Sequence, residues 1–192
     1  MYTASDERGR KTVMDLLTGV DRRVSIGRLD KDSEGLLLMT DDGAFINLLT
    51  HPSGGVGKLY RVTVNPRATE EQIIQMSSGV VLDDGVKTQP CVIHVVVDEP
   101  GRTVLEITLH EGRNRQIRRM CSAVGLQVVR LRRTAEGPVK LGMLQPGEYR
   151  ELKKSEINAL RNAAQHKSRS SEAPTRTAPR RPGPLRPRKE QG

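Results

Sequence analysis

Three segments rich in β-branched residues constrain the fold of this 192-residue chain more than any other feature. They are residues 58–65 (KLYRVTVN), 91–97 (CVIHVVV) and 103–110 (TVLEITLH). Valine, isoleucine and threonine favour the pleated, half-buried surface of a sheet. The turn-forming residues 98–101 (DEPG) lie between the last two segments, so we expect these two to form an antiparallel hairpin.

Helical patterns lie between and after these strands. Residues 69–79 (TEEQIIQMSSG) start with a candidate N-cap threonine, carry acids in the first turn and end at a glycine. In residues 114–124, apolar side chains recur at i, i+3, i+4 and i+7, and a glycine follows. A further strand is predicted at 126–133 and a last helix at 155–164. The chain is therefore predicted to be an α+β protein with a mixed, largely antiparallel sheet and flanking helices.

The balance of charges narrows the class of partner. Lysine and arginine number 32 against 23 acidic residues, so the formal net charge is +9 and the pI is about 10.0. A strongly basic protein favours a polyanionic partner, and nucleic acid is the leading candidate. Aromatic residues make up only 2% of the chain, which argues against a surface that stacks several bases.

The hydropathy of the chain argues against a membrane protein. No apolar run approaches the roughly 18 consecutive residues of a membrane-spanning helix. Residues 1–10 (MYTASDERGR) lack the apolar core of a signal peptide. We therefore expect a cytoplasmic protein without membrane contact, and a monomer is the default expectation.

The chain divides into a folded body and a tail. Residues 166–192 contain eight lysines or arginines, two glutamates and five prolines, with almost no large apolar side chains. Such a segment cannot bury enough apolar surface to fold alone. We expect residues 1–165 to form one catalytic domain and residues 166–192 to be a disordered basic tail. The tail either binds phosphates or only increases solubility.

Cysteine usage gives no sign of a metal site. Cys91 and Cys121 are the only cysteines, they lie far apart, and neither belongs to a CxxC or His/Cys cluster. We expect ordinary core thiols and no bound metal.

The acidic segment 27–43 (GRLDKDSEGLLLMTDDG) has two interpretations. The first is a calcium-binding loop, because acidic residues and a glycine fall at positions 1, 3, 5, 6 and 12 of the EF-hand pattern: Asp30, Asp32, Glu34, Gly35 and Asp41. Against it, the last position lacks the longer glutamate, position 9 is Leu38, and no long helix precedes the loop. Calcium binding is therefore the weaker interpretation.

The second interpretation is a resemblance to a family. Segment 27–43 resembles the signature of RNA pseudouridine synthases, in the RsuA/RluB branch that modifies ribosomal RNA. Three later segments resemble further motifs of that family in the same order: 59–64 (LYRVTV), 111–120 (EGRNRQIRRM) and 131–152 (LRRTAEGPVKLGMLQPGEYREL). Four motifs in the correct order are more specific than any one of them. The resemblance implies the pseudouridine synthase catalytic fold and isomerisation of uridine in ribosomal RNA.

The resemblance also implies catalytic roles for three residues and no cofactor. The reaction breaks the N-glycosidic bond of uridine, rotates the uracil and rejoins it through carbon. Asp30 matches the essential aspartate, which acts either as a nucleophile on the sugar or as a base, and both routes stay open. Arg118 matches the arginine that pairs with this aspartate. Tyr60 matches the tyrosine that stacks on the target base.

Further residues are expected to bind RNA. A stacked uridine cannot present its glycosidic bond, so the nucleotide must leave the helix. Arg28 matches an arginine that fills the vacated space, and Ile117 an apolar residue that packs against the base. Lys58 precedes the tyrosine strand as a support. The other arginines of the 111–120 motif are expected to contact RNA as well: Arg113, Arg115 and Arg119.

The chain also departs from the family pattern. Relatives usually carry an RNA-binding module and a strand before the point where this sequence starts, so we expect a truncated N-terminal strand. The basic, proline-rich C-terminal extension resembles that of members acting on large-subunit (23S) rRNA. The alternative function is a catalytically inactive protein that binds rRNA or assists ribosome assembly.

Overall fold

The computed structural model describes residues 13–17, 23–51 and 56–171, with side chains in the last helix as far as Gln165. The N-terminal half contains η1 (Val13–Leu16), β1 (Val24–Ile26), β2 (Glu34–Gly35), β3 (Leu38–Thr40), α1 (Gly43–Thr50), β4 (Lys58–Asn65) and α2 (Glu70–Ser78). The C-terminal half contains β5 (Val92–Glu99), β6 (Arg102–Leu109), α3 (Gln116–Ala123), β7 (Gln127–Glu136), β8 (Val139–Lys140) and α4 (Lys154–Ser171). No helix in the described ranges is long and apolar enough to cross a membrane.

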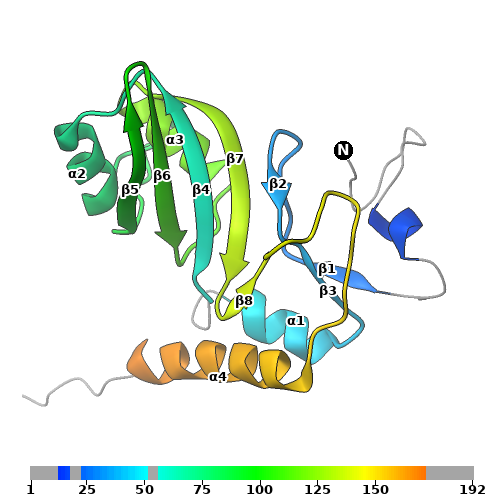
Figure 1. The fold of residues 1–192 in the computed structure, drawn as a ribbon. Coiled ribbons are helices and arrows are strands. Elements are labelled where there is room, and N and C mark those ends of the chain that lie inside the picture. Colours follow the sequence, from blue (N-terminus) through cyan, green and yellow to red (C-terminus); the bar gives the residue numbers. More distant parts are fainter. Residues whose placement is uncertain (1–12, 18–22, 52–55, 172–192) are drawn as a thin grey trace, which may run out of the picture.

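A six-stranded sheet forms the centre of the molecule (Figure 1). Its strand order is β2-β7-β4-β6-β5, and β8 also pairs with β7. Only the β2–β7 pair is parallel, while the other pairs are antiparallel. Strands β1 and β3 form a separate antiparallel pair. The predicted α+β class with a largely antiparallel sheet is confirmed.

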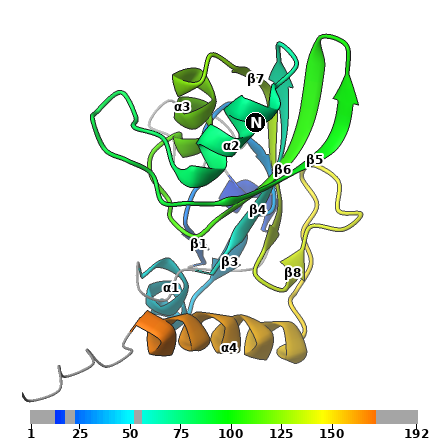
Figure 2. The same cartoon turned by 90° about the vertical axis from the view of Figure 1, so that its left-hand side faces the viewer.

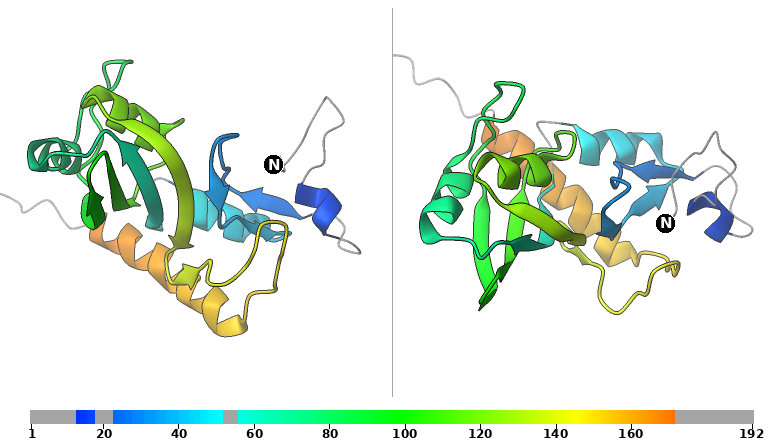
Figure 3. Two further views of the ribbon diagram at one scale, coloured as in Figure 1. Left: turned by 45° about the horizontal axis from the view of Figure 1, so that its top comes forward. Right: turned by 90° about the horizontal axis from the view of Figure 1, so that it is seen from above.

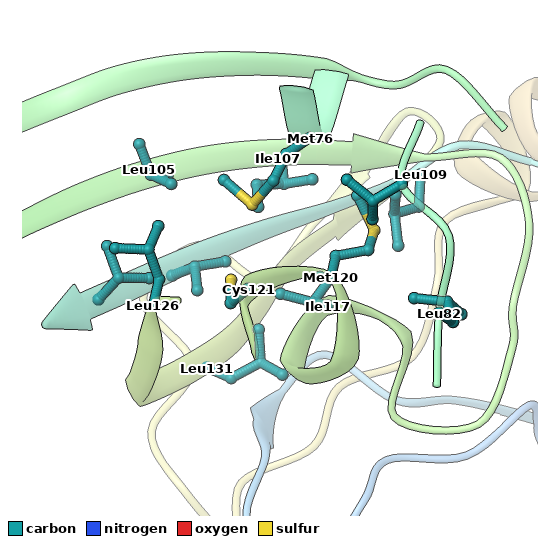
Figure 4. Packing of buried hydrophobic residues seen from close by; sticks show 13 residues of the cluster. Met76, Leu82, Leu105, Ile107, Leu109, Ile117, Met120, Cys121, Leu126 and Leu131 are labelled. Carbon is teal, nitrogen blue, oxygen red and sulfur yellow. The ribbon is translucent and has the colours of Figure 1, made fainter. Parts of the chain in front are cut away.

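The large sheet buries one face against α2 and α3 (Figure 1, Figure 2). Leu105 and Ile107 of β6 meet Met76 of α2 and Met120 of α3, and all four side chains are fully buried (Figure 4). The apolar stripe predicted for 114–124 is the part of α3 that packs here. This core fixes the sheet on which the candidate site is built.

A second apolar cluster lies at the other end of the molecule. It joins Ile26 and Leu38 of the small sheet to Phe45 and Leu49 of α1 and to Leu160 of α4. Figure 3 shows α1 and α4 beside the small sheet. The two clusters flank the segment that carries Asp30, which runs from β1 to β2.

Most predicted elements are confirmed, with differences at the ends. The β5–β6 hairpin turns at Pro100-Gly101, so β5 extends two residues further than predicted, to Glu99, and β6 begins and ends one residue earlier than predicted. The strand predicted at 126–133 continues to Glu136 as β7. The helix predicted at 155–164 continues to Ser171, so the first residues assigned to the tail are helical. Residues 172–192, and the predicted truncation before residue 13, lie outside the described residues.

Helix α2 has the predicted cap in full. The Thr69 side chain accepts a hydrogen bond from the Gln72 amide, and the Gln72 side chain accepts one from the Thr69 amide. Thr69→Ala is therefore expected to lower the free energy of unfolding by about 1 kcal/mol. Urea titration measures it, with Ser78→Ala as the control, because this hydroxyl is exposed and forms no hydrogen bond with the residues that the structure describes. Equal effects of the two substitutions would contradict the capping role.

Candidate functional site

Asp30 lies in a tight turn of the segment between β1 and β2. The Ser33 amide donates a hydrogen bond of 2.9 Å to the Asp30 carbonyl, which closes the turn. Helix α3 holds the outside of this turn through two arginines. The Arg118 Nη2 atom lies 2.5 Å from the Asp32 carbonyl oxygen, and the Arg115 Nη1 atom lies 3.1 Å from the Asp32 carboxylate. The turn is thereby attached to the larger core.

The other end of this segment is attached to β7. Strand β2 runs parallel to β7, with Gly35 opposite Arg133. The Leu36 amide donates a 2.8 Å hydrogen bond to the Arg133 carbonyl. A Cβ atom on Gly35 would lie 2.2 Å from that carbonyl oxygen, so only glycine permits this approach.

A β-bulge aligns four polar side chains across β4 and β7. The register shifts between Leu59 and Tyr60, so that Tyr60 faces Arg133 and Lys58 faces Glu136. Directly paired residues project from the same face of a sheet. The Lys58 Nζ atom lies 3.8 Å from Glu136 Oε1. Arg133 and Glu136 are 2% and 0% exposed, so the bulge brings two buried charges to the tyrosine.

The pKa of Tyr60 shows which charges surround its phenol. Burial raises this pKa above its ordinary value, and Glu136 and Asp30 raise it further by their negative charges. The neighbouring Arg133 guanidinium opposes the shift and lowers the pKa. Tyr60 is therefore kept protonated, and Asp30 is close enough to act on it electrostatically. The structure thus brings together two of the three predicted catalytic residues.

Arg118 is placed differently from the prediction. Its guanidinium bonds the carbonyl oxygens of Asp32 and Val128, at 2.5 and 3.2 Å. Within the described part of the chain, the Asp30 carboxylate forms no hydrogen bond or ion pair. The predicted Arg118–Asp30 pair is thus absent here, because the turn presents the Asp32 carbonyl to α3. Arg118 holds the backbone of the Asp30 turn instead.

The residues predicted to bind RNA fall into three groups. Most of them have protein partners: Lys58 with Glu136, Arg113 with Glu111, Arg115 with Asp32, and Arg119 with Asp83 and Asp84. Ile117 is 3% exposed and belongs to the core under the large sheet, which leaves almost no surface for a base in this conformation. Among the cationic residues predicted to bind RNA, the exposed Arg28 is the one whose side chain has no bonded partner in the described residues.

A cleft of about 1200 Å³ opens beside Asp30. It lies between the small sheet and the 141–152 segment. Arg28, Lys31 and Arg132 line it together with Asp30, and these three cations form no ion pair within the described ranges. The arrangement provides a carboxylate next to positive charges that could contact phosphates.

The calcium interpretation does not fit the structure. The Asp32 carboxylate is paired with Arg115, and the Glu34 carboxylate lies 2.6 Å from Arg130. Part of the proposed loop forms strands β2 and β3. No group of three or more His, Cys, Asp or Glu residues suited to a metal ion occurs in the part of the chain that the structure describes.

Sequence reasoning missed Arg133 and Glu136 as members of the site. A charge pair with this spacing would point to opposite faces of a regular strand, so only the bulge brings both to one face. The available signal was weak: Arg133 ends the segment predicted to be a strand and Glu136 follows it, and the 131–152 motif contains several other charged residues.

The two cysteines are expected to be unreactive. Burial raises the pKa of Cys91 to about 11 and that of Cys121 to about 12. Because only the thiolate is nucleophilic, both should react with iodoacetamide at pH 8 about 100-fold more slowly than a free thiol, and faster as the pH rises toward these values. Alkylation followed by mass spectrometry measures the rates, with the urea-unfolded protein as the control. Fast labelling of the native protein would contradict burial.

The fold is that of a pseudouridylate synthase. A crystal structure of a pseudouridylate synthase aligns with a TM-score of 0.73 at 34% sequence identity, over 78% of this chain and 65% of that one. The family model for RNA pseudouridylate synthase matches residues 2–123. The chain belongs to the RNA pseudouridylate synthase family.

Curated relatives agree with this assignment. An uncharacterized RNA pseudouridine synthase of Aquifex aeolicus is 41% identical over 153 residues, which are 79% of this chain and 61% of the relative. Ribosomal large subunit pseudouridine synthase B of Bacillus subtilis is 39% identical over 166 residues, which are 85% of this chain and 68% of the relative. The chain thus spans about two thirds of the length of these relatives.

Proposed function

We propose that this protein isomerises uridine to pseudouridine in ribosomal RNA, with Asp30 as the catalytic carboxylate and Tyr60 beside the target base. The observation that carries the proposal is the placement of Asp30. The Asp30 carboxylate lines the cleft, has no bonded partner in the described residues and lies within electrostatic reach of Tyr60. Because the chain belongs to the pseudouridine synthase family, this placement favours a catalytic role. An unpaired carboxylate is available to act as a nucleophile or a base.

The reaction requires only groups that the chain carries. The bond between the ribose C1′ and uracil N1 breaks, and a new bond forms between C1′ and C5. The proton on C5 leaves, and N1 gains a proton. Asp30 either bonds to the sugar carbon or removes a proton from the sugar, and both routes end with the carboxylate restored. No cofactor enters this balance.

The cations at the cleft that form no ion pair with the described residues are proposed to hold the RNA backbone. Arg28 and Lys31 flank Asp30 in sequence and line the same cleft. In contrast, Arg113 and Arg119 on the α3 side are paired with carboxylates. Phosphate binding therefore costs less free energy at Arg28 and Lys31, where no ion pair with a described residue has to break.

Large-subunit rRNA is the proposed substrate, acted on in the cytoplasm by a monomeric protein. One support is the similarity to the Bacillus subtilis relative, a ribosomal large subunit pseudouridine synthase. The other is the basic segment 172–192, which can add attraction to the phosphate backbone in a salt-dependent manner.

Release of tritium tests the proposal. Large-subunit and small-subunit transcripts labelled with tritium at uridine C5 are incubated separately with the protein, because each isomerisation sends the C5 hydrogen to solvent. Release from the large-subunit RNA alone is expected. Binding of both RNAs without any release would favour the alternative, a protein that binds rRNA without turnover.

A further inference from the structure

Arg133 is the largest fully buried side chain among the described residues, and the proposed chemistry does not use it. Burying a guanidinium is costly unless acceptors surround its donors. A buried arginine at this position therefore needs an explanation from its contacts.

The Arg133 side chain bonds both ends of the segment that carries Asp30. Its Nε atom donates to the Leu36 carbonyl at 2.7 Å, and its Nη1 atom lies 3.5 Å from the Arg28 carbonyl. Its own backbone carbonyl accepts from the Leu36 amide at 2.8 Å. Arg133 thus contacts residues on both sides of the aspartate.

The same guanidinium faces the tyrosine strand. Arg133 is the cross-strand partner of Tyr60 and lowers the pKa of its phenol. The buried Glu136 carboxylate follows on β7, with Lys58 3.8 Å away. The Arg133 Nη2 atom is buried and has no hydrogen-bond partner among the described residues, so it is not committed to other parts of the fold.

We propose that Arg133 is a positioning residue of this site: its guanidinium fixes the Asp30 segment against the Tyr60 strand, while Glu136 balances its charge. The inference rests on the proposed function, since positioning has meaning only for a reacting Asp30. Two side chains on separate segments must keep their spacing within fractions of an ångström for efficient chemistry. Arginine suits this task, because its planar fork reaches two acceptors at fixed angles, whereas lysine offers a single flexible charge.

The kinetic test compares Arg133→Lys and Arg133→Met with the wild-type protein in the tritium-release assay. Both variants are expected to lower kcat, by roughly 10-fold for lysine and 100-fold for methionine, with KM changed less than about threefold. Arg102→Met is the control, because this exposed arginine is paired with Glu99 at the turn of the β5–β6 hairpin. Unchanged kcat in the folded Arg133→Met protein would overturn the proposal.

A second measurement follows the segment itself and does not need activity. Hydrogen exchange of peptides covering residues 27–37 should become at least tenfold faster in the Arg133 variants, while amides of β6 stay protected. If Arg133→Met does not fold, the lysine variant decides. Unaltered exchange in a folded variant would refute the anchoring role, even if the wild-type protein proved inactive on RNA.

The third measurement reads the charge balance at the tyrosine. With 3-fluorotyrosine at position 60, ¹⁹F NMR follows ionisation of the phenol, which fluorine brings into an accessible pH range. Loss of the Arg133 charge in the methionine variant should raise the pKa of this phenol, and Glu136→Gln should lower it. If the pKa of the phenol does not shift in these opposite directions in the two variants, the two charges do not act on the tyrosine.

Discussion

Asp30→Asn is expected to lower tritium release from rRNA on the order of 10⁴-fold or more, to the limit of detection. Asparagine has nearly the size of aspartate but no negative charge, so it can neither bond covalently to the sugar nor remove a proton from it. The turn should survive the substitution, because the bonds that hold it use the Asp30 carbonyl and the backbone and carboxylate of Asp32 rather than the Asp30 side chain. RNA affinity should stay the same or increase slightly as one negative charge disappears.

Asp41→Asn is the matched control for this experiment. It makes the same chemical change on an exposed residue that lines the same cleft, yet it should keep at least half of the activity. Rates are compared at one salt concentration with saturating RNA. Equal losses in the two variants would mean that total charge in the cleft, and not the carboxylate at position 30, controls the reaction.

Gly35→Ala is expected to lower the free energy of unfolding by roughly 3–5 kcal/mol, from backbone strain combined with overpacking. Gly35 has a φ of +114°, which side-chain-bearing residues rarely adopt. A Cβ atom would also lie 2.2 Å from the Arg133 carbonyl oxygen and 2.7 Å from its amide nitrogen. Backbone atoms in a paired strand cannot move aside as a flexible side chain can. Strand β2 must therefore separate from β7.

Gly27→Ala separates strain from steric overlap. Gly27 also has a positive φ, +73°, but no atom lies within 4 Å of the position that a Cβ atom would take, so only about 1–2 kcal/mol is expected. Urea unfolding measures both variants, and tritium release reports whether the Asp30 segment has shifted. Similar costs at the two glycines would contradict the close approach of β2 to β7.

Local sequence information was sufficient for much of the large sheet. The range predicted for β4 is the range observed, because alternation and β-branched residues act over neighbouring positions. Helix α2 starts at its predicted cap, since Thr69 and Gln72 are three residues apart and need no tertiary partner. Asp30 and Tyr60 were likewise predicted from motifs that are contiguous in sequence.

Other features depend on contacts between distant segments. Helix α1 was not predicted, although Asp42 caps it, because its eight residues are too few to show a clear helical period. A helix this short is stabilised mainly by packing, here against α4. The extension of β7 to Glu136 depends on pairing with β4 and β8. Strand β2 has only two residues and exists because β7 supplies its partner.

The sequence by itself determined the hairpin, the capped helix and the candidate carboxylate, since each is encoded within a short contiguous segment. It also determined the α+β class, which follows from the order of such segments along the chain. Tertiary structure alone decided how the site is held together. It placed Arg118 on the Asp32 carbonyl rather than on Asp30, and it turned Arg133 toward the tyrosine through a bulge. Side-chain direction after a bulge depends on strand register, which is set by long-range pairing rather than by neighbouring residues.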